Sequence, residues 1–261
     1  MARVDEQPVM SASLSDNIVL IRLNRTAKRN AINNAMLQCL ADEVRNAERD
    51  GHVRCIVVTG GRDMFSAGAD IKEMQADGIA AIQNRNRAEN WSVLETTHIP
   101  MIAAVEGICF GGGHELAMLC DIVICSETAM FGQPEIKLGH IPGDGATQRL
   151  RRLVGKYAAM QMILTGEPVD ASKALRLGLV GEVVPAGSSE ARATEIAQLI
   201  ARHSGKALGF AKDAVLAADE HSLSAGLDRE RRNIALAFTT KDQKEGLSAF
   251  LEKRMPRFVD E

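Results

Sequence analysis

Two glycine-rich segments of the chain have the residue types of a site that stabilises negative charge on an oxygen atom. One covers residues 65–70 (FSAGAD), the other residues 110–115 (FGGGHE), and each follows a predicted strand. Glycine allows a ligand to approach the backbone closely, and a helix that starts after the second segment would direct its positive end toward that ligand. Two backbone N–H groups converging on one carbonyl oxygen form an oxyanion hole, and losing one such donor costs about 10²–10³ in rate. Taken alone, each segment is also compatible with a plain turn.

Two glutamates, Glu115 and Glu135, follow these segments in largely apolar surroundings, and they are 20 residues apart. Burial disfavours the charged form of a carboxylate, so such a group can serve as a general acid or base. Together, the acids and the glycine segments predict a site that polarises a carbonyl group and moves protons. For either glutamate considered alone, a structural ion pair or a helix cap remains an alternative.

Several other kinds of site are excluded by spacing. His114 and Glu115 begin like a zinc-protease helix, but the residue four positions after His114 is Met118, so the second metal ligand is missing. Ser66 precedes Ala67 and Gly68, yet Met64 replaces the first glycine of a nucleophile elbow. The glycine segments also lack the spacing of a dinucleotide-binding loop or a P-loop. The sequence therefore predicts neither a metal site nor a nucleotide cofactor.

The elements that must position these residues alternate between strands and helices. Strands are predicted at residues 17–23, 53–59, 100–105 and 121–125, and helices at about residues 36–50 and 114–120. In the first helix, apolar side chains recur with the helical period and a glycine follows its end. Such alternation predicts an α/β fold with crossover connections.

Two further regions have a different pattern. Residues 71–94 are polar and compatible with helix, which predicts a mobile cover over the site. From residue 189 onward only helices are predicted, at residues 191–201, 206–218, 223–238 and 241–253. We therefore expect a catalytic core over residues 1–188 and a helical region over residues 189–261.

Composition limits the possible partners. The chain has 31 Lys and Arg against 34 Asp and Glu, a net charge of −3, which argues against nucleic acid as the main partner. No apolar run approaches the roughly 20 residues that span a bilayer, and residues 1–16 lack the apolar region of a signal peptide. Five cysteines without a Cys-x-x-Cys pair indicate thiols in a reducing compartment. We expect a cytoplasmic protein that does not bind membranes.

Ordered motifs along nearly the whole chain resemble the enoyl-CoA hydratase (crotonase) family. The matching segments are residues 23–25 (LNR), 65–74 (FSAGADIKEM), 111–118 (GGGHELAM), 131–135 (FGQPE), 138–143 (LGHIPG), 147–150 (TQRL) and 245–253 (EGLSAFLEK). The resemblance implies a crotonase-like spiral of repeated ββα units with C-terminal helices that build a trimer or a dimer of trimers. It also implies an acyl-CoA thioester substrate, with no metal and no cofactor besides the coenzyme A that belongs to the substrate.

The resemblance also implies roles for individual residues. The backbone N–H groups of Ala67 and Gly112 resemble the oxyanion hole, and Glu115 and Glu135 resemble the hydratase acids. The resemblance implies that Phe250 and Lys253 complete the coenzyme A pocket of a neighbouring subunit. The remaining implied substrate-binding residues are Lys28, Arg29, Ala31, Ala67, Gly68, Ala69, Asp70, Ile71 and Gly143.

A hydratase of this kind adds water reversibly across the 2,3 double bond of a 2-enoyl-CoA to give a 3-hydroxyacyl-CoA. Having both acids favours hydration, while an enoyl-CoA isomerase, a dehydratase for a polar acyl-CoA and a non-catalytic acyl-CoA-binding protein remain alternatives. Asp144 departs from the family pattern, in which a small residue stands at this position. A third carboxylate near Glu115 and Glu135 predicts a raised pKa for a neighbouring acid, whereas Asp144 could instead face solvent or cap the helix beginning near Ala146.

Overall fold

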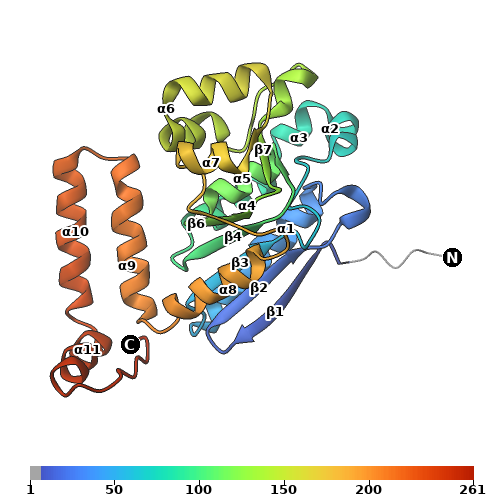
Figure 1. Cartoon of the computed structure of the whole chain (residues 1–261). Helices are drawn as coiled ribbons and strands as arrows, with labels where there is room; N and C mark the ends of the chain where they lie inside the picture. The colour runs from blue at the N-terminus through green and yellow to red at the C-terminus, as the bar shows by residue number, and fades with distance from the viewer. Residues whose placement is uncertain (1–6) are drawn as a thin grey trace.

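The computed structural model describes residues 7–261, and its core is a six-stranded sheet (Figure 1). The strand order is β1-β2-β3-β4-β6-β9, with β1 antiparallel to β2 and the other neighbours parallel. The strands are β1 (Val9–Ser15), β2 (Ile18–Leu23), β3 (Cys55–Thr59), β4 (Met101–Val105), β6 (Ile122–Ser126) and β9 (Glu182–Val184). This sheet confirms the α/β class and the four predicted strands.

Both faces of the central strands are covered, which is why β3 and β4 are apolar along nearly their whole length. On one face, α8 (Ser189–Ile200) packs against β3, β4 and β6 through Ala193 and Ala197. On the other, α1 (Asn34–Asp50) buries the apolar stripe predicted from its sequence. The Asn33 side chain caps α1 by accepting from the Met36 N–H, and Gly51 ends it in a left-handed conformation.

A smaller, three-stranded sheet extends the repeat of strand, strand and helix. It contains β5 (Ile108–Phe110), β7 (Met130–Gly132) and β8 (Val169–Asp170) in the order β5-β7-β8. Strand β5 follows β4 and leads into α5 (Gly112–Leu119), and β7 follows β6 in the same way. Strands β1, β5, β7, β8 and β9 were not predicted from the sequence, whereas this ββα arrangement agrees with the spiral that the resemblance implies.

Several helices surround the pocket described below. The cover predicted at residues 71–94 consists of three helices, α2 (Ile71–Asp77), α3 (Ile79–Ile82) and α4 (Arg85–Thr96), and α4 packs against α1. The 3-10 helix η2 (Pro134–Leu138) and the start of α6 (Ala146–Thr165) also lie at the pocket. Helix α7 (Ala171–Leu177) packs against α6, and the 3-10 helix η1 (Thr26–Lys28) precedes the loop that pairs with residues 67–70.

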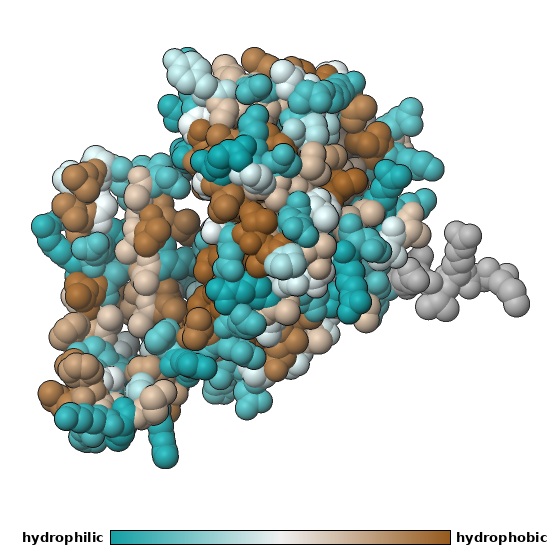
Figure 2. Space-filling model, viewed as in Figure 1, coloured by the Kyte–Doolittle hydropathy of each residue, from teal (hydrophilic) through white to brown (hydrophobic). Residues whose placement is uncertain are grey.

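The C-terminal helices α9 (Gly205–Leu216), α10 (Leu223–Ala237) and α11 (Lys241–Leu251) stand beside the sheet (Figure 1). A short 3-10 helix, η3 (Ala217–Asp219), joins α9 to α10, and an Arg229–Asp213 ion pair links the two helices. The boundary predicted at residue 189 coincides with the start of α8, which itself packs on the sheet, so the projecting part begins with α9. Large apolar side chains lie exposed there, among them Leu223, Ile234 and Phe238, and Figure 2 shows apolar surface over α9 and α10.

Candidate active site

The two glycine segments lie side by side at the centre of the fold. Ser66 forms a parallel bridge with Cys109, and the Phe110 N–H donates to the Ser66 carbonyl oxygen at 3.0 Å. A Cβ atom on Gly113 would lie 2.5 Å from the Ser66 Cβ, so only glycine allows this approach. The structure thus brings together the two segments that the sequence analysis assigned to one pocket.

The predicted oxyanion donor Ala67 is wrong, because its N–H donates to the Arg29 carbonyl oxygen at 3.0 Å. The Asp70 N–H also bonds the neighbouring segment, at the Ile32 carbonyl oxygen. Gly68 lies between these two residues and has a φ of 112°. This conformation interrupts the regular alternation of N–H directions along an extended strand, so the Ala69 N–H does not bond to residues 29–32.

Ala69 and Gly112 provide the pair of free donors instead. Neither N–H has an acceptor within residues 7–261, and Gly112 is the first residue of α5. A Cβ atom placed on Gly112 would lie 3.5 Å from the Ala69 nitrogen, so the two peptide groups are neighbours. Two unbonded N–H groups, of which that of Gly112 lies at a helix N-terminus, can together hold one thioester oxygen as negative charge develops on it.

Glu115 lies in the first turn of α5 and is buried. Its Oε1 accepts hydrogen bonds from the N–H groups of Asp144 and Ala146, both at 2.9 Å. Burial, and next the negative charge of Asp144, raise the pKa of Glu115 to about 7, with a smaller contribution from Glu135. Near neutral pH this carboxyl group can therefore both accept and release a proton.

Glu135 enters the pocket from η2 and lies over the turn before α5. A Cβ atom on Gly111 would lie 2.5 Å from the Glu135 Oε1, so a side chain there would displace the acid. Burial raises the pKa of Glu135 as well. The buried Gln133 amide oxygen accepts a hydrogen bond from the His114 Nδ1 at 3.1 Å. The NH₂ group of the same amide donates to the two carboxylate oxygens of Glu135, at 3.2 and 3.3 Å. Burial lowers the pKa of His114 to about 4, so the imidazole is neutral. Its Nδ1 donates to Gln133, which in turn holds Glu135.

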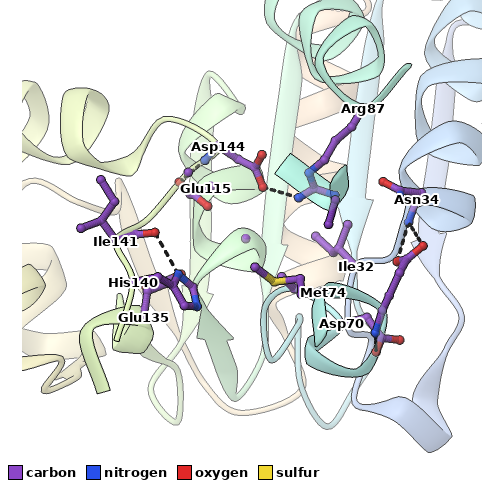
Figure 3. Close-up of a pocket in the computed structure, with 15 residues that line it drawn as sticks. Ile32, Asn34, Asp70, Met74, Arg87, Glu115, Glu135, His140, Ile141 and Asp144 are labelled. Carbon is purple, nitrogen blue, oxygen red and sulfur yellow. Dashed lines mark hydrogen bonds and ion pairs between the residues drawn. The ribbon is translucent and has the colours of Figure 1, made fainter. Parts of the chain in front are cut away.

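Both acids and both N–H groups border one pocket (Figure 3). Apolar side chains of Ile32, Met74 and Ile141 form part of its wall, and His140 lies next to Glu135. The pocket is lined by Ile32, Asn34, Ala69, Asp70, Glu73, Met74, Ala81, Arg87, Gly112, Glu115, Glu135, His140, Ile141, Gly143 and Asp144. It therefore includes Ala69, Asp70 and Gly143 from the predicted substrate-binding set.

Asp144 neither faces solvent nor caps α6, so both of these alternatives are wrong. Its side chain is 16 % exposed and forms an ion pair with Arg87 of α4. Gly145 is the N-cap residue of α6, and no side chain caps that end among the described residues. The Arg149 Nη1 donates to the Asp144 carbonyl oxygen at 3.0 Å, which fixes the loop from the other side. The sequence analysis missed Arg87, which it placed only within a polar cover.

The remaining predicted residues lie at the rim or away from the pocket. Lys28, Arg29 and Ala31 belong to the loop that pairs with residues 67–70, and Ile71 is half-exposed at the start of α2. The Asp70 carboxylate accepts from Arg25 at 2.9 Å and from the Lys72 N–H at 3.2 Å, so it holds this rim together.

Phe250 is exposed on α11, and Lys253 follows that helix in a left-handed conformation. Figure 1 shows α11 far from α2 and α5, so within one chain these two residues do not reach the pocket. Their role in a neighbouring subunit stays a prediction.

Within residues 7–261, no group of three or more His, Cys, Asp or Glu side chains is placed to hold a metal ion. Over the same residues, no helix combines the length and apolarity needed to cross a membrane.

Comparison with known proteins identifies the family. The family model described as enoyl-CoA hydratase/isomerase matches residues 13–261, nearly the whole chain. The chain belongs to the enoyl-CoA hydratase/isomerase family. This match confirms the resemblance that the motifs indicated. The pocket with the two acids and the two free N–H groups is therefore the candidate active site of a member of this family.

Relatives of similar length support this assignment. The chain is 45 % identical to a 2,3-dehydroadipyl-CoA hydratase of Escherichia coli K12, over 94 % of this chain and 96 % of that protein. It is 47 % identical to a probable enoyl-CoA hydratase of Mycobacterium tuberculosis, over 92 % and 93 % of the two chains. A crystal structure of an enoyl-CoA hydratase from Bacillus anthracis superposes with a TM-score of 0.92 at 36 % identity, covering 98 % of this chain and 100 % of that chain. The crotonase-type fold of this family member is thus confirmed.

Proposed function

We propose that this protein is a hydro-lyase that adds water reversibly across the 2,3 double bond of a 2-enoyl-CoA thioester. One observation carries the proposal: Glu115 and Glu135 border the same pocket as the free N–H groups of Ala69 and Gly112. These N–H groups polarise the thioester oxygen, which makes the β-carbon electrophilic and stabilises the enolate that forms. The family assignment and the named hydratases at 45 % and 47 % identity support the same reaction.

In the proposed mechanism, one water lies between the two carboxyl groups. Glu115 removes a proton from this water as its oxygen bonds to the β-carbon, and the double-bond electrons move toward the thioester oxygen. Glu135 supplies the proton that the α-carbon takes up. A pKa of about 7 suits Glu115 to this exchange, because the group is then partly ionised near neutral pH. This chemistry requires two carboxyl groups and an oxyanion hole, so we propose that the substrate's own coenzyme A is the only cofactor-like group involved.

The substrate's coenzyme A part is proposed to lie along the rim formed by residues 28–31 and 67–71. Here the Arg25–Asp70 ion pair and the backbone pairing of residues 29–32 with residues 67–70 keep the edge in place. We further propose that exposed apolar side chains of α9, α10 and α11 become buried in a trimer or a dimer of trimers. In such an assembly, Phe250 and Lys253 would contact the coenzyme A bound by a neighbour. We propose a cytoplasmic location.

Hydration of crotonyl-CoA tests the proposed activity. The absorbance of the conjugated thioester should fall, and mass spectrometry should detect 3-hydroxybutyryl-CoA. As a matched comparison, 3-butenoyl-CoA lacks the conjugated double bond and reports isomerase activity as a rise in the same absorbance. Persistence of crotonyl-CoA together with conversion of 3-butenoyl-CoA would identify an isomerase instead.

A further inference from the structure

A charged pair forms one wall of the pocket next to the reacting groups. Arg87 of α4 donates to the Asp144 carboxylate, which belongs to the loop before α6 (Figure 3). Their side chains are only 14 % and 16 % exposed. An Asp144 oxygen lies 3.9 Å from the position of a Cβ on Gly112, so the pair is close to the oxyanion donors. With the thioester oxygen held by these donors, the Arg87–Asp144 pair would lie beside the acyl group near its double bond.

Most hydrogen-bond donors of this guanidinium lack a protein partner. A guanidinium carries five N–H groups, and within residues 7–261 the Arg87 side chain donates only to Asp144. The guanidinium lies over the Trp91 ring, with the Arg87 Cζ 5.9 Å from the ring centroid. The Arg87 nitrogens without a protein partner are not fully enclosed and border the pocket, so water or an atom of the ligand can accept from them. An alkyl chain that displaced such water would leave the donors unsatisfied.

The charge of the pocket decides which acceptor fits best. Asp144 already neutralises Arg87, and the carboxyl groups of Glu115 and Glu135 lie in the same pocket. An additional carboxylate on the acyl chain would be repelled by these acids. A neutral oxygen accepts from Arg87 without that repulsion.

We propose that the Arg87–Asp144 pair selects 2-enoyl-CoA substrates whose acyl chain carries a neutral hydroxyl or carbonyl oxygen just beyond the double bond. This inference rests on the proposed hydratase function and adds the chemical class of the acyl group. Arg87 donates to the substrate oxygen, and Asp144 holds the guanidinium in place. Plain alkyl chains are disfavoured because they offer no acceptor to the guanidinium.

Two substrates of equal length test the proposal. In 4-hydroxycrotonyl-CoA, a hydroxyl group replaces the terminal methyl group of 2-pentenoyl-CoA. The double variant Arg87→Met/Asp144→Ala removes both charges and so avoids leaving one buried charge unpaired. The ratio of kcat/KM values for the hydroxylated over the plain substrate should fall about 10- to 100-fold from wild type to the double variant, the range for a hydrogen bond to a charged group.

Arg85→Met is the matched control, because Arg85 lies on the same helix but its side chain is 90 % exposed. This variant should keep the wild-type ratio. An equal ratio in wild type and double variant would overturn the selective role and leave the pair as a link between α4 and the loop. A marked wild-type preference for glutaconyl-CoA, which carries a carboxylate, would also overturn it.

Calorimetric binding separates this inference from the proposed function. The saturated analogues 4-hydroxybutyryl-CoA and pentanoyl-CoA need no turnover, and the wild-type protein should bind the hydroxylated one about tenfold or more tightly. Such a preference without hydration of any enoyl-CoA would refute the hydratase function but support the selectivity. Hydration together with equal binding of both analogues would refute the selectivity alone, even if the double variant failed to fold.

Discussion

The carboxylate of Asp144 should control the pH at which Glu115 ionises. The pKa of Glu115 is raised from 4.5 to about 7, first by burial and second by the charge of Asp144. The whole rise of the pKa corresponds to a few kcal/mol, at about 1.4 kcal/mol for each pKa unit. Asp144 is the second of these causes, so its charge contributes less to the rise of the pKa than burial does. Asp144→Asn removes this like charge, so Glu115 ionises more easily and the acid limb of kcat/KM should move to lower pH, by a part of the whole rise.

A second variant gives a shift of opposite sign. Arg87→Met removes the cation and leaves the Asp144 charge uncompensated, so the pKa of Glu115 should rise and the acid limb should move to higher pH. Initial rates of crotonyl-CoA hydration between pH 5 and 9 give the position of the acid limb in each variant. Asp42→Asn serves as a control, because Asp42 is exposed on α1 and pairs with Arg45. An unmoved acid limb in Asp144→Asn, or shifts of the same sign in both variants, would refute the electrostatic reasoning.

Three further predictions concern the donors, the stability and the assembly. Replacing the Ala69 amide by an ester should lower the hydration rate about 10²–10³-fold, whereas an ester at Ala67 should mainly lower stability by about 1 kcal/mol; equal rate losses would contradict the donor assignment. Glu115→Gln should raise the melting temperature at pH 8 by a few degrees. In the wild type, the stability that is present below pH 4.5 is lost as the pH rises through about 7, where the buried Glu115 carboxylate ionises, whereas glutamine stays neutral. The gain should vanish near pH 4, and a melting temperature unchanged at pH 8 would contradict it. Light scattering should detect a trimer or hexamer at micromolar concentration, and a stable monomer would refute the proposed burial of α9 to α11.

Much of the fold could be predicted because the central strands are apolar runs that end in glycine turns. Strands β3 and β4 lie between helices on both faces, so nearly every residue in them is apolar. The antiparallel strand β1 was missed although Met10, Ala12 and Leu14 alternate with serines, because six of its seven residues are exposed and it lacks the continuous apolar run of the central strands. Strands β5, β7, β8 and β9 have only two or three residues each, too few for a period to appear.

The site could be predicted as a pair of acids beside two glycine segments, but its finer geometry could not. The positive φ of Gly68 separates the Ala69 donor from the Ala67 donor, and this is a property of the folded backbone. The Arg87–Asp144 contact joins residues that are 57 positions apart in the chain. Nothing in the polar pattern of α4 indicated which of its side chains faces the pocket.

The hydration rates of two glutamine variants show whether both acids take part in the reaction. Glutamine keeps the shape of each side chain but cannot transfer a proton, so Glu115→Gln and Glu135→Gln should each lower the crotonyl-CoA hydration rate by about 10²–10⁴-fold or more. Calorimetry with butyryl-CoA should show that both variants still bind the thioester with nearly the wild-type affinity. Near-wild-type hydration by either variant, with binding intact, would contradict the two-acid mechanism.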